Sequence, residues 1–141
     1  MHQGRHAERL ARVIIGRFFE VYNRLRYGFL EGVYVRALVE ELRRLDIPCE
    51  REYPVEVLYR GVPVGFYRAD LLVDGCLIVE VKAGRKLDDS ARWQTLNYLR
   101  ATGLPLGLVL HFGPEAHFHR VIGPSHRLRR VESRSSEEGC S

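Results

Sequence analysis

Long hydrophobic runs are absent from this 141-residue sequence, and cysteines are few. No segment offers the roughly 20 consecutive apolar residues that a membrane-spanning helix needs, and residues 1–5 lack the apolar core of a signal peptide. Cys49, Cys76 and Cys140 are widely spaced and form no C-x-x-C pair, which argues against a zinc knuckle, a redox motif or a disulfide framework. These absences predict a cytoplasmic protein that has reduced thiols and no membrane partner.

Lysine is scarce as well. Of the 22 basic residues, only Lys82 and Lys86 are lysines, and the others are arginines. A lysine in such a chain indicates a position that requires a compact ammonium group. The formal net charge of +4 and the pI near 9.2 are compatible with a polyanionic partner, but they identify none.

The remaining composition is that of an ordinary globular domain, with 45% hydrophobic and 28% charged residues. The length suits one domain, which we expect over residues 1–123. Residues 124–141 consist mostly of Arg, Ser, Glu and Gly, a composition that cannot bury a core. We expect them to form a disordered polar tail.

Apolar residues recur at spacings of three and four in two N-terminal segments, which predicts helices over residues 7–25 and 30–45. A third helix is expected over residues 88–101, because good N-cap residues stand at its start and Gly and Pro follow its end.

Five segments are typical of strands, because they alternate apolar and polar residues or are almost wholly apolar. They are residues 55–59, 62–73, 76–81, 106–112 and 118–122. The first three predict an antiparallel meander, the fourth suits an interior strand covered on both faces, and the fifth suits an edge strand. Together with the helices they predict an α/β fold with a mixed sheet.

The strand before the third helix carries two charges on one face. Side chains alternate along a strand, so Glu80 and Lys82 point to the same side, about 7 Å apart. This distance is too long for a tight ion pair, but it allows both groups to surround one phosphate and one metal ion. The pattern permits catalysis without proving it.

Whether Asp70 joins Glu80 depends on the turn between their strands. A two-residue Asp-Gly loop places Asp70 on the face opposite Glu80. A bulged three-residue loop over residues 73–75, in which Leu72 pairs with Cys76, places both carboxylates on one face. A catalytic site therefore requires the longer turn.

With that turn, oxygen ligands for a hard divalent cation come together. The carboxylates of Asp70 and Glu80 and the carbonyl of Val81 could hold Mg²⁺ or Mn²⁺ and leave positions for water and a phosphate oxygen. Lys82 would orient or help to deprotonate the attacking water and offset the developing negative charge. An arginine could offset that charge but could not take part in proton transfer.

Polar residues also line the helix that follows. Gln94 and Tyr98 stand at an i, i+4 spacing with Asn97 beside them, and this stripe could contact a metal-bound water or a nucleic-acid backbone. Arg85 and Lys86, in the preceding loop, could contact phosphates or simply be solvated. Both interpretations of the loop residues stay open.

Taken in order, these residues resemble the GxxExxY family, a group of small proteins within the PD-(D/E)XK nuclease superfamily. The resemblance covers roughly residues 8–122, and the combination is far more specific than a lone E-x-K. The matching segments are Gly28-Phe29-Leu30-Glu31-Gly32-Val33-Tyr34, Tyr67 to Val73, Val79 to Ala83, Gln94 to Tyr98 and Gly103 to Leu108.

The resemblance implies a restriction-endonuclease-like core and a metal-dependent phosphodiesterase centre. It carries catalytic roles to Glu31, Asp70, Glu80 and Lys82, and matches Gln94 and Tyr98 to the Q-x-x-x-Y element of the exonuclease-like branch. The candidate substrate contacts are therefore Tyr98, Arg85 and Lys86, and Gln94 joins the catalytic candidates.

Some residues depart from the family or suggest another site. Ala69 replaces the Pro of the superfamily's name, which carries no chemistry, and Arg26 and His111 also differ from the usual family residues. The spacing of His111, His117 and His119 suggests a zinc site, but no Cys or carboxylate partner is obvious.

Other residues have simpler explanations that the sequence leaves open. Glu31 could be an acidic residue of the kind favoured near a helix N-terminus. Asp74 is better placed as a turn former than as a metal ligand. Tyr34 and Trp93 are expected in the core.

The predicted reaction is Mg²⁺- or Mn²⁺-assisted hydrolysis of a nucleic-acid phosphodiester, with water as the nucleophile. DNA is favoured over RNA by superfamily analogy alone. The alternative is a catalytically silent nucleic-acid-binding or protein-interaction module on the same fold, against which the intact Asp70, Glu80 and Lys82 count. The sequence also leaves a homodimer open.

Overall fold

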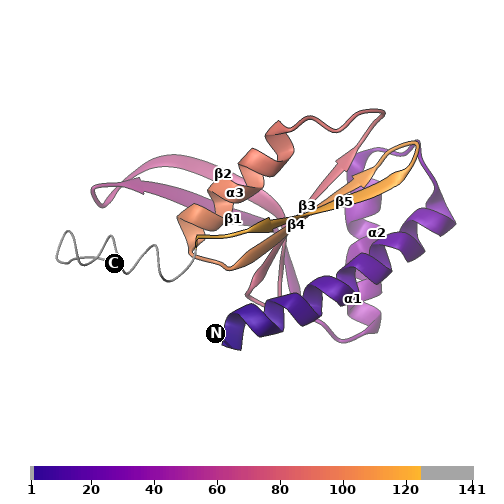
Figure 1. Ribbon diagram of the computed structural model, residues 1–141, viewed down its shortest axis with the longest axis horizontal. Helices are drawn as coiled ribbons and strands as arrows, with labels where there is room; N and C mark the ends of the chain where they lie inside the picture. The colour runs from indigo at the N-terminus through magenta and orange to yellow at the C-terminus, as the bar shows by residue number, and fades with distance from the viewer. Residues whose placement is uncertain (1, 125–141) are drawn as a thin grey trace.

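Three helices and five strands make up residues 2–124, the part of the chain that the computed structural model describes (Figure 1). They are α1 (His2–Leu25), α2 (Glu31–Arg44), β1 (Cys49–Tyr59), β2 (Val62–Val73), β3 (Leu77–Ala83), α3 (Ser90–Thr102), β4 (Leu106–Phe112) and β5 (Ala116–Ile122). The predicted polar tail, from residue 125 onward, lies outside the described residues. No helix within residues 2–124 is long and apolar enough to cross a membrane.

The strands form one mixed sheet in the order β1-β2-β3-β4-β5. β1, β2 and β3 are antiparallel neighbours, β3 and β4 run parallel, and β4 and β5 are antiparallel. A parallel pair needs a crossover connection, and α3 supplies it. The predicted α/β fold, with its antiparallel meander and its mixed sheet, is confirmed.

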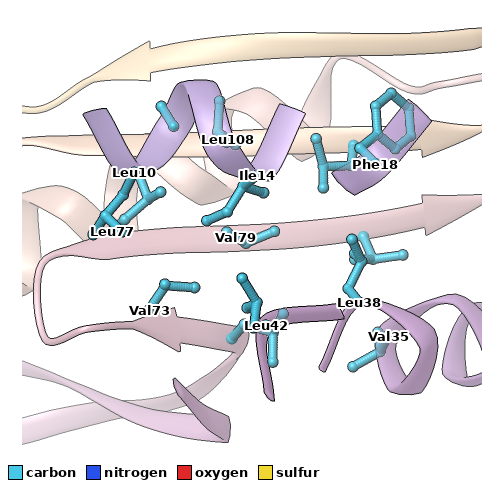
Figure 2. Close-up of a cluster of buried hydrophobic side chains, with 14 of the residues drawn as sticks. Leu10, Ile14, Phe18, Val35, Leu38, Leu42, Val73, Leu77, Val79 and Leu108 are labelled. Carbon is cyan, nitrogen blue, oxygen red and sulfur yellow. The ribbon is translucent and has the colours of Figure 1, made fainter. Parts of the chain in front are cut away.

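α1 and α2 cover one face of the sheet. On α1, Leu10, Ile14 and Phe18 recur every four residues and bury one stripe of the helix, and α2 contributes Leu38 and Leu42. Figure 2 shows these side chains beside the strand residues Val73, Leu77, Val79 and Leu108. Because burial of each large apolar side chain contributes roughly 1.5–3 kcal/mol, this layer anchors β3 firmly.

α3 covers the opposite face and packs on a second, smaller cluster. Its buried residues Ala91, Tyr98 and Leu99 contact the cluster that includes Ile78 and Val109 of the sheet. All seven residues of β4 are buried, as the almost wholly apolar run predicted. Glu80 of β3, which points to the α3 side, is therefore shielded from water, whereas Lys82 at the end of the strand stays partly exposed.

Several element boundaries differ from the predictions by one or two residues, and two differ by more. β1 begins at Cys49 instead of residue 55, because residues 49–54 pair with β2 but are mostly exposed, and no apolar alternation marks them. α1 begins at His2 instead of residue 7.

The turn between β2 and β3 differs from both forms that the sequence suggested. Val73 pairs with Leu77, so the loop consists of residues 74–76. The pairing of Leu72 with Cys76 was therefore wrong, although the loop length of three was right. Asp74 and Gly75 both have positive φ, at 49° and 71°, a conformation that Gly adopts freely and Asp tolerates.

Candidate functional site

Two carboxylates meet where β2 and β3 separate. Counted outward from the turn, the last paired residues are Leu71 and Val79, and Asp70 and Glu80 are the next residues on the two strands. Glu80 Oε2 then accepts a hydrogen bond of 2.8 Å from the Asp70 N–H, and Asp70 Oδ2 accepts one of 2.7 Å from the Val81 N–H. These reciprocal bonds hold both carboxylates at the fork between the strands.

The side chain of Glu31, the first residue of α2, contacts the same edge of β3 two residues beyond Val81. Its Oε2 accepts a hydrogen bond of 3.2 Å from the Ala83 N–H. Alternate residues of a strand direct their backbone groups to the same edge, so Val81 and Ala83 both face the side that β2 has left. The Val81 carbonyl points to that side together with its N–H, beside the two carboxylates.

A buried tyrosine positions the segment that carries Glu31. Tyr34 is fully buried, and its hydroxyl donates to the Arg26 carbonyl and accepts from the Phe29 N–H at 3.1 Å. Its ring stacks on Phe112 of β4, with the ring centroids 4.0 Å apart. The prediction that Tyr34 belongs to the core is confirmed, and the loop before α2 is tied to that core.

The carboxylate pair is electrostatically unfavourable without a cation. Burial, with the Asp70 carboxylate as the next cause, raises the pKa of Glu80 to about 8, and its side chain is only 3% exposed. Burial also raises the pKa of Asp70, against the lowering effects of the Val81 N–H and of Lys82. Among the described residues, neither carboxylate forms an ion pair within 4.0 Å.

Lys82 stands on the same face of β3, two residues beyond Glu80. Its side chain is partly exposed, and its charge lowers the pKa of both Asp70 and Glu80 without a direct ion pair. The ammonium group is thus near the carboxylates and still accessible from solvent, where a phosphate or a water molecule can reach it.

α3 supplies a tyrosine and an amide to the same face. The buried Tyr98 hydroxyl donates to the Arg68 carbonyl at 3.4 Å, and the Gln94 side chain forms a hydrogen bond with it. Burial, followed by the charges of Glu80 and Asp70, raises the pKa of Tyr98 to about 12. The hydroxyl therefore stays protonated at neutral pH and can donate a hydrogen bond.

Not every prediction about single residues held. Trp93 is 65% exposed, so its assignment to the core was wrong. Its place in the helical pattern beside apolar neighbours misled, because α3 turns this position toward solvent. Arg85 and Lys86 are exposed in the loop before α3, a position that fits phosphate contacts and solvation equally well.

The histidine alternative finds no support in residues 2–124. His111 Nε2 lies 2.8 Å from the Gly84 carbonyl, and no group of three or more His, Cys, Asp or Glu side chains in this part of the chain could hold a metal ion. The same finding shows that Glu31 does not join Asp70 and Glu80 as a third clustered ligand.

The structure contains a groove near the carboxylates that the sequence did not predict. It has a volume of about 690 Å³, lies between α3 and the β1–β2 hairpin, and is lined by Tyr67, Trp93 and Asn97 among others. Strand and helix periodicity gives no sign of it, because exposed and buried aromatic residues look alike in a sequence.

Comparison with known proteins adds an independent observation. A family model described as the PD-(D/E)XK nuclease superfamily matches residues 8–121. The chain belongs to this superfamily. The matched residues include Glu31, Asp70, Glu80 and Lys82, and they run from within α1 to the next-to-last residue of β5.

Among solved structures, this chain is similar to the crystal structure of SSO0001, at 16% identity and a TM-score of 0.47. The alignment covers 69% of this chain and 52% of that chain, so it spans about half of the solved protein. The comparison with curated proteins found no match.

Enzymes of the superfamily typically depend on a metal ion, and the residues present fit one. Two acidic side chains and a backbone carbonyl are hard oxygen donors of the kind that Mg²⁺ and Mn²⁺ bind. The buried Glu80 beside Asp70 has no cation partner among the described residues, and a buried carboxylate requires one or a proton. The ligands would be Asp70, Glu80 and the Val81 carbonyl.

Proposed function

We propose that the chain is a Mg²⁺- or Mn²⁺-dependent nuclease that hydrolyses phosphodiester bonds, with DNA favoured over RNA, and that it is a member of the GxxExxY family. The observation that carries this proposal is the pair of carboxylates, Asp70 and Glu80, held by reciprocal backbone hydrogen bonds beside a lysine. A structural ion pair would place the lysine against one carboxylate instead.

The family-level proposal is supported by what the name-giving motif does in this fold. Glu31 contacts the backbone of β3 at the edge of the site, and Tyr34 ties the loop before α2 to the core. Gly28, whose φ is 129°, lies in that loop, in a conformation that other residues rarely adopt. Each motif position therefore has a physical reason connected with the site.

When bound, a divalent ion would polarise the phosphate and lower the pKa of a water molecule. Lys82 would orient that water and offset charge in the transition state as an ammonium, and it could help to deprotonate the water only after losing its own proton to solvent. Gln94 would donate a hydrogen bond to a phosphate oxygen, and the Tyr98 hydroxyl would exchange its long bond to the Arg68 carbonyl for one to a phosphate oxygen. Glu31 would hold β3 in register through Ala83.

The experiment that tests the proposal is cleavage of labelled single- and double-stranded DNA and RNA with Mg²⁺ and with Mn²⁺. Asp70→Asn keeps an oxygen that can accept from the Val81 N–H but loses the negative charge, and Lys82→Ala removes the ammonium group. We expect either change to lower kcat by about 10² to 10⁴, the usual worth of a positioned acid or base. Oligonucleotide binding should be retained.

Lys86→Ala provides the matched comparison, because it removes the other lysine of the chain from the exposed loop next to the site. We expect it to raise KM and leave kcat nearly unchanged. Cleavage that persists in Asp70→Asn would contradict the assignment of Asp70 to the catalytic centre. Binding without metal-dependent cleavage in the wild type would favour the silent nucleic-acid-binding module.

A further inference from the structure

The groove between α3 and the β1–β2 hairpin has the composition of a base-binding site. Figure 1 shows α3 beside the hairpin, whose far end extends beyond the helix. Trp93 of α3 and Tyr67 of β2 both line the groove, and 65% of the first and 50% of the second are exposed. A tryptophan that is mostly exposed is unusual in a folded domain, and its ring is free to stack on a flat ligand.

Amide and basic side chains accompany these rings. Gln94 and Asn97, one turn apart on α3, line the same groove, and an amide can donate to and accept from the edge of a nucleobase. Arg100 provides a positive charge for a phosphate, and Glu56 stands on the hairpin side. Stacking surfaces combined with amides and an arginine match a nucleotide better than a peptide or a lipid.

The groove borders β2, the strand that carries Asp70, because Tyr67 of β2 lines it. Tyr98 lines it and is bonded through its hydroxyl to the Arg68 carbonyl, two residues before Asp70. Tyr67 contacts the Tyr98 ring, with the centroids 6.0 Å apart. Two residues of a strand span about 7 Å, so we expect a base next to a phosphate held at Asp70 to reach the groove.

We propose that this groove binds an unpaired nucleobase next to the scissile phosphodiester, so that the preferred substrate is a single strand or an unpaired end. The inference rests on the proposed nuclease function and deepens it. In a duplex, the faces of the bases are covered by their neighbours and cannot stack on Trp93 and Tyr67. A base in an unpaired strand can leave the stack and enter the groove at small cost.

Intrinsic fluorescence offers a direct test, because Trp93 is the single tryptophan of the chain. The full-length protein is titrated with an oligothymidylate in the presence of a chelator, and then with an abasic oligonucleotide of the same length. We expect a saturable loss of tryptophan fluorescence with the first and little change with the second, because only the first carries bases. Equal effects of both would overturn the proposal, since they would indicate contact with the backbone alone.

Substitution then separates stacking from general affinity. Binding of a labelled single strand, measured by fluorescence anisotropy, should weaken about tenfold in Trp93→Ala and in Tyr67→Ala, as expected for the loss of one stacking partner. Trp93→Phe, which keeps a ring, should recover part of the affinity. Tyr59→Ala is the control, because this tyrosine of the same hairpin is 64% exposed but does not line the groove.

The outcomes distinguish this inference from the proposed function. One outcome is that the protein cleaves blunt duplexes as well as single strands while Trp93→Ala leaves its binding unchanged. That result would contradict base binding in the groove but would still support the catalytic centre. Base-dependent quenching without any cleavage would support base binding in the groove and contradict the proposed nuclease activity. Equal loss of binding in Tyr59→Ala and Trp93→Ala would also contradict the inference.

Discussion

At the scale of single residues, the most informative group is Glu80, because its surroundings work against its charge. It lies almost fully buried beside Asp70, and within residues 2–124 Lys82 is the cation that partly offsets the two carboxylates. Binding sites commonly carry such local instability, which a ligand relieves. Stability measured without metal therefore reports on this site.

We predict that Glu80→Gln stabilises the metal-free protein at alkaline pH. The folded state holds the Glu80 proton until its pKa of about 8, whereas the unfolded chain releases it near the ordinary value of 4.5. Between these values the folded state binds more protons, so a rise in pH lowers the free energy of unfolding of the wild type. Glutamine stays neutral and can still accept from the Asp70 N–H.

Thermal unfolding in chelator at pH 5 to 9 measures this effect. The Tm of Glu80→Gln should exceed that of the wild type by about 5 °C or more at pH 8, and the gap should shrink toward pH 5. Glu50→Gln, at an exposed position on β1, should not produce this pattern. A constant gap across the range would contradict the role assigned to the Glu80 charge.

At the scale of elements, the turn between β2 and β3 decides whether the site exists. A strand shifted by one residue turns every side chain to the other face, and the observed three-residue loop places Asp70 on the face of Glu80. The loop achieves this with two consecutive positive φ angles, at Asp74 and Gly75. Its conformation is therefore a structural requirement of the site.

We predict that Gly75→Ala lowers the free energy of unfolding by about 1 kcal/mol, because alanine is strained at a φ of 71°. Steric clash does not contribute, since no described atom lies within 4 Å of the added methyl group. Gly16→Ala is the matched control, because its added methyl group also meets open space but lies within α1. There alanine should raise the free energy of unfolding by about 0.5–1 kcal/mol. Urea denaturation measures the free energy of unfolding of both variants. A Gly75→Ala variant more stable than the wild type would contradict the predicted backbone strain at residue 75.

At the scale of the whole molecule, two tyrosines connect distant segments through Phe112. Tyr34 of α2 and Tyr22 of α1 both stack on this ring. The Tyr34 hydroxyl bonds to the loop before α2, and the Tyr22 hydroxyl donates to the Gly113 and Pro114 carbonyls after β4. Only the first of these loops leads to Glu31, so the two hydroxyls offer a comparison between stability and function.

We predict that Tyr34→Phe and Tyr22→Phe both lower the free energy of unfolding by about 1–3 kcal/mol, because each leaves buried backbone groups without a partner. Metal-dependent cleavage should fall only in Tyr34→Phe, since the loop that holds Glu31 against Ala83 is then loosened. Calorimetry and initial rates measured well below both Tm values provide the comparison. Equal rates in the two variants would remove Tyr34 from the positioning of Glu31.

Much of the fold could be predicted from the sequence because its signals are local. The spacing of Leu10, Ile14 and Phe18 marks a helix, and the almost wholly apolar β4 marks a strand that is covered on both faces. The start of β1 could not be predicted, because residues 49–54 are held by pairing with β2 and not by an apolar pattern of their own.

The sequence by itself determined which charged residues share a face of β3, because side-chain alternation follows from backbone geometry alone. Only the tertiary structure decided that Asp70 meets Glu80, since the loop register depends on how β2 and β3 pair. It also decided that Trp93 faces a groove and not the core, because the hairpin and α3, which together form that groove, are brought together only by folding.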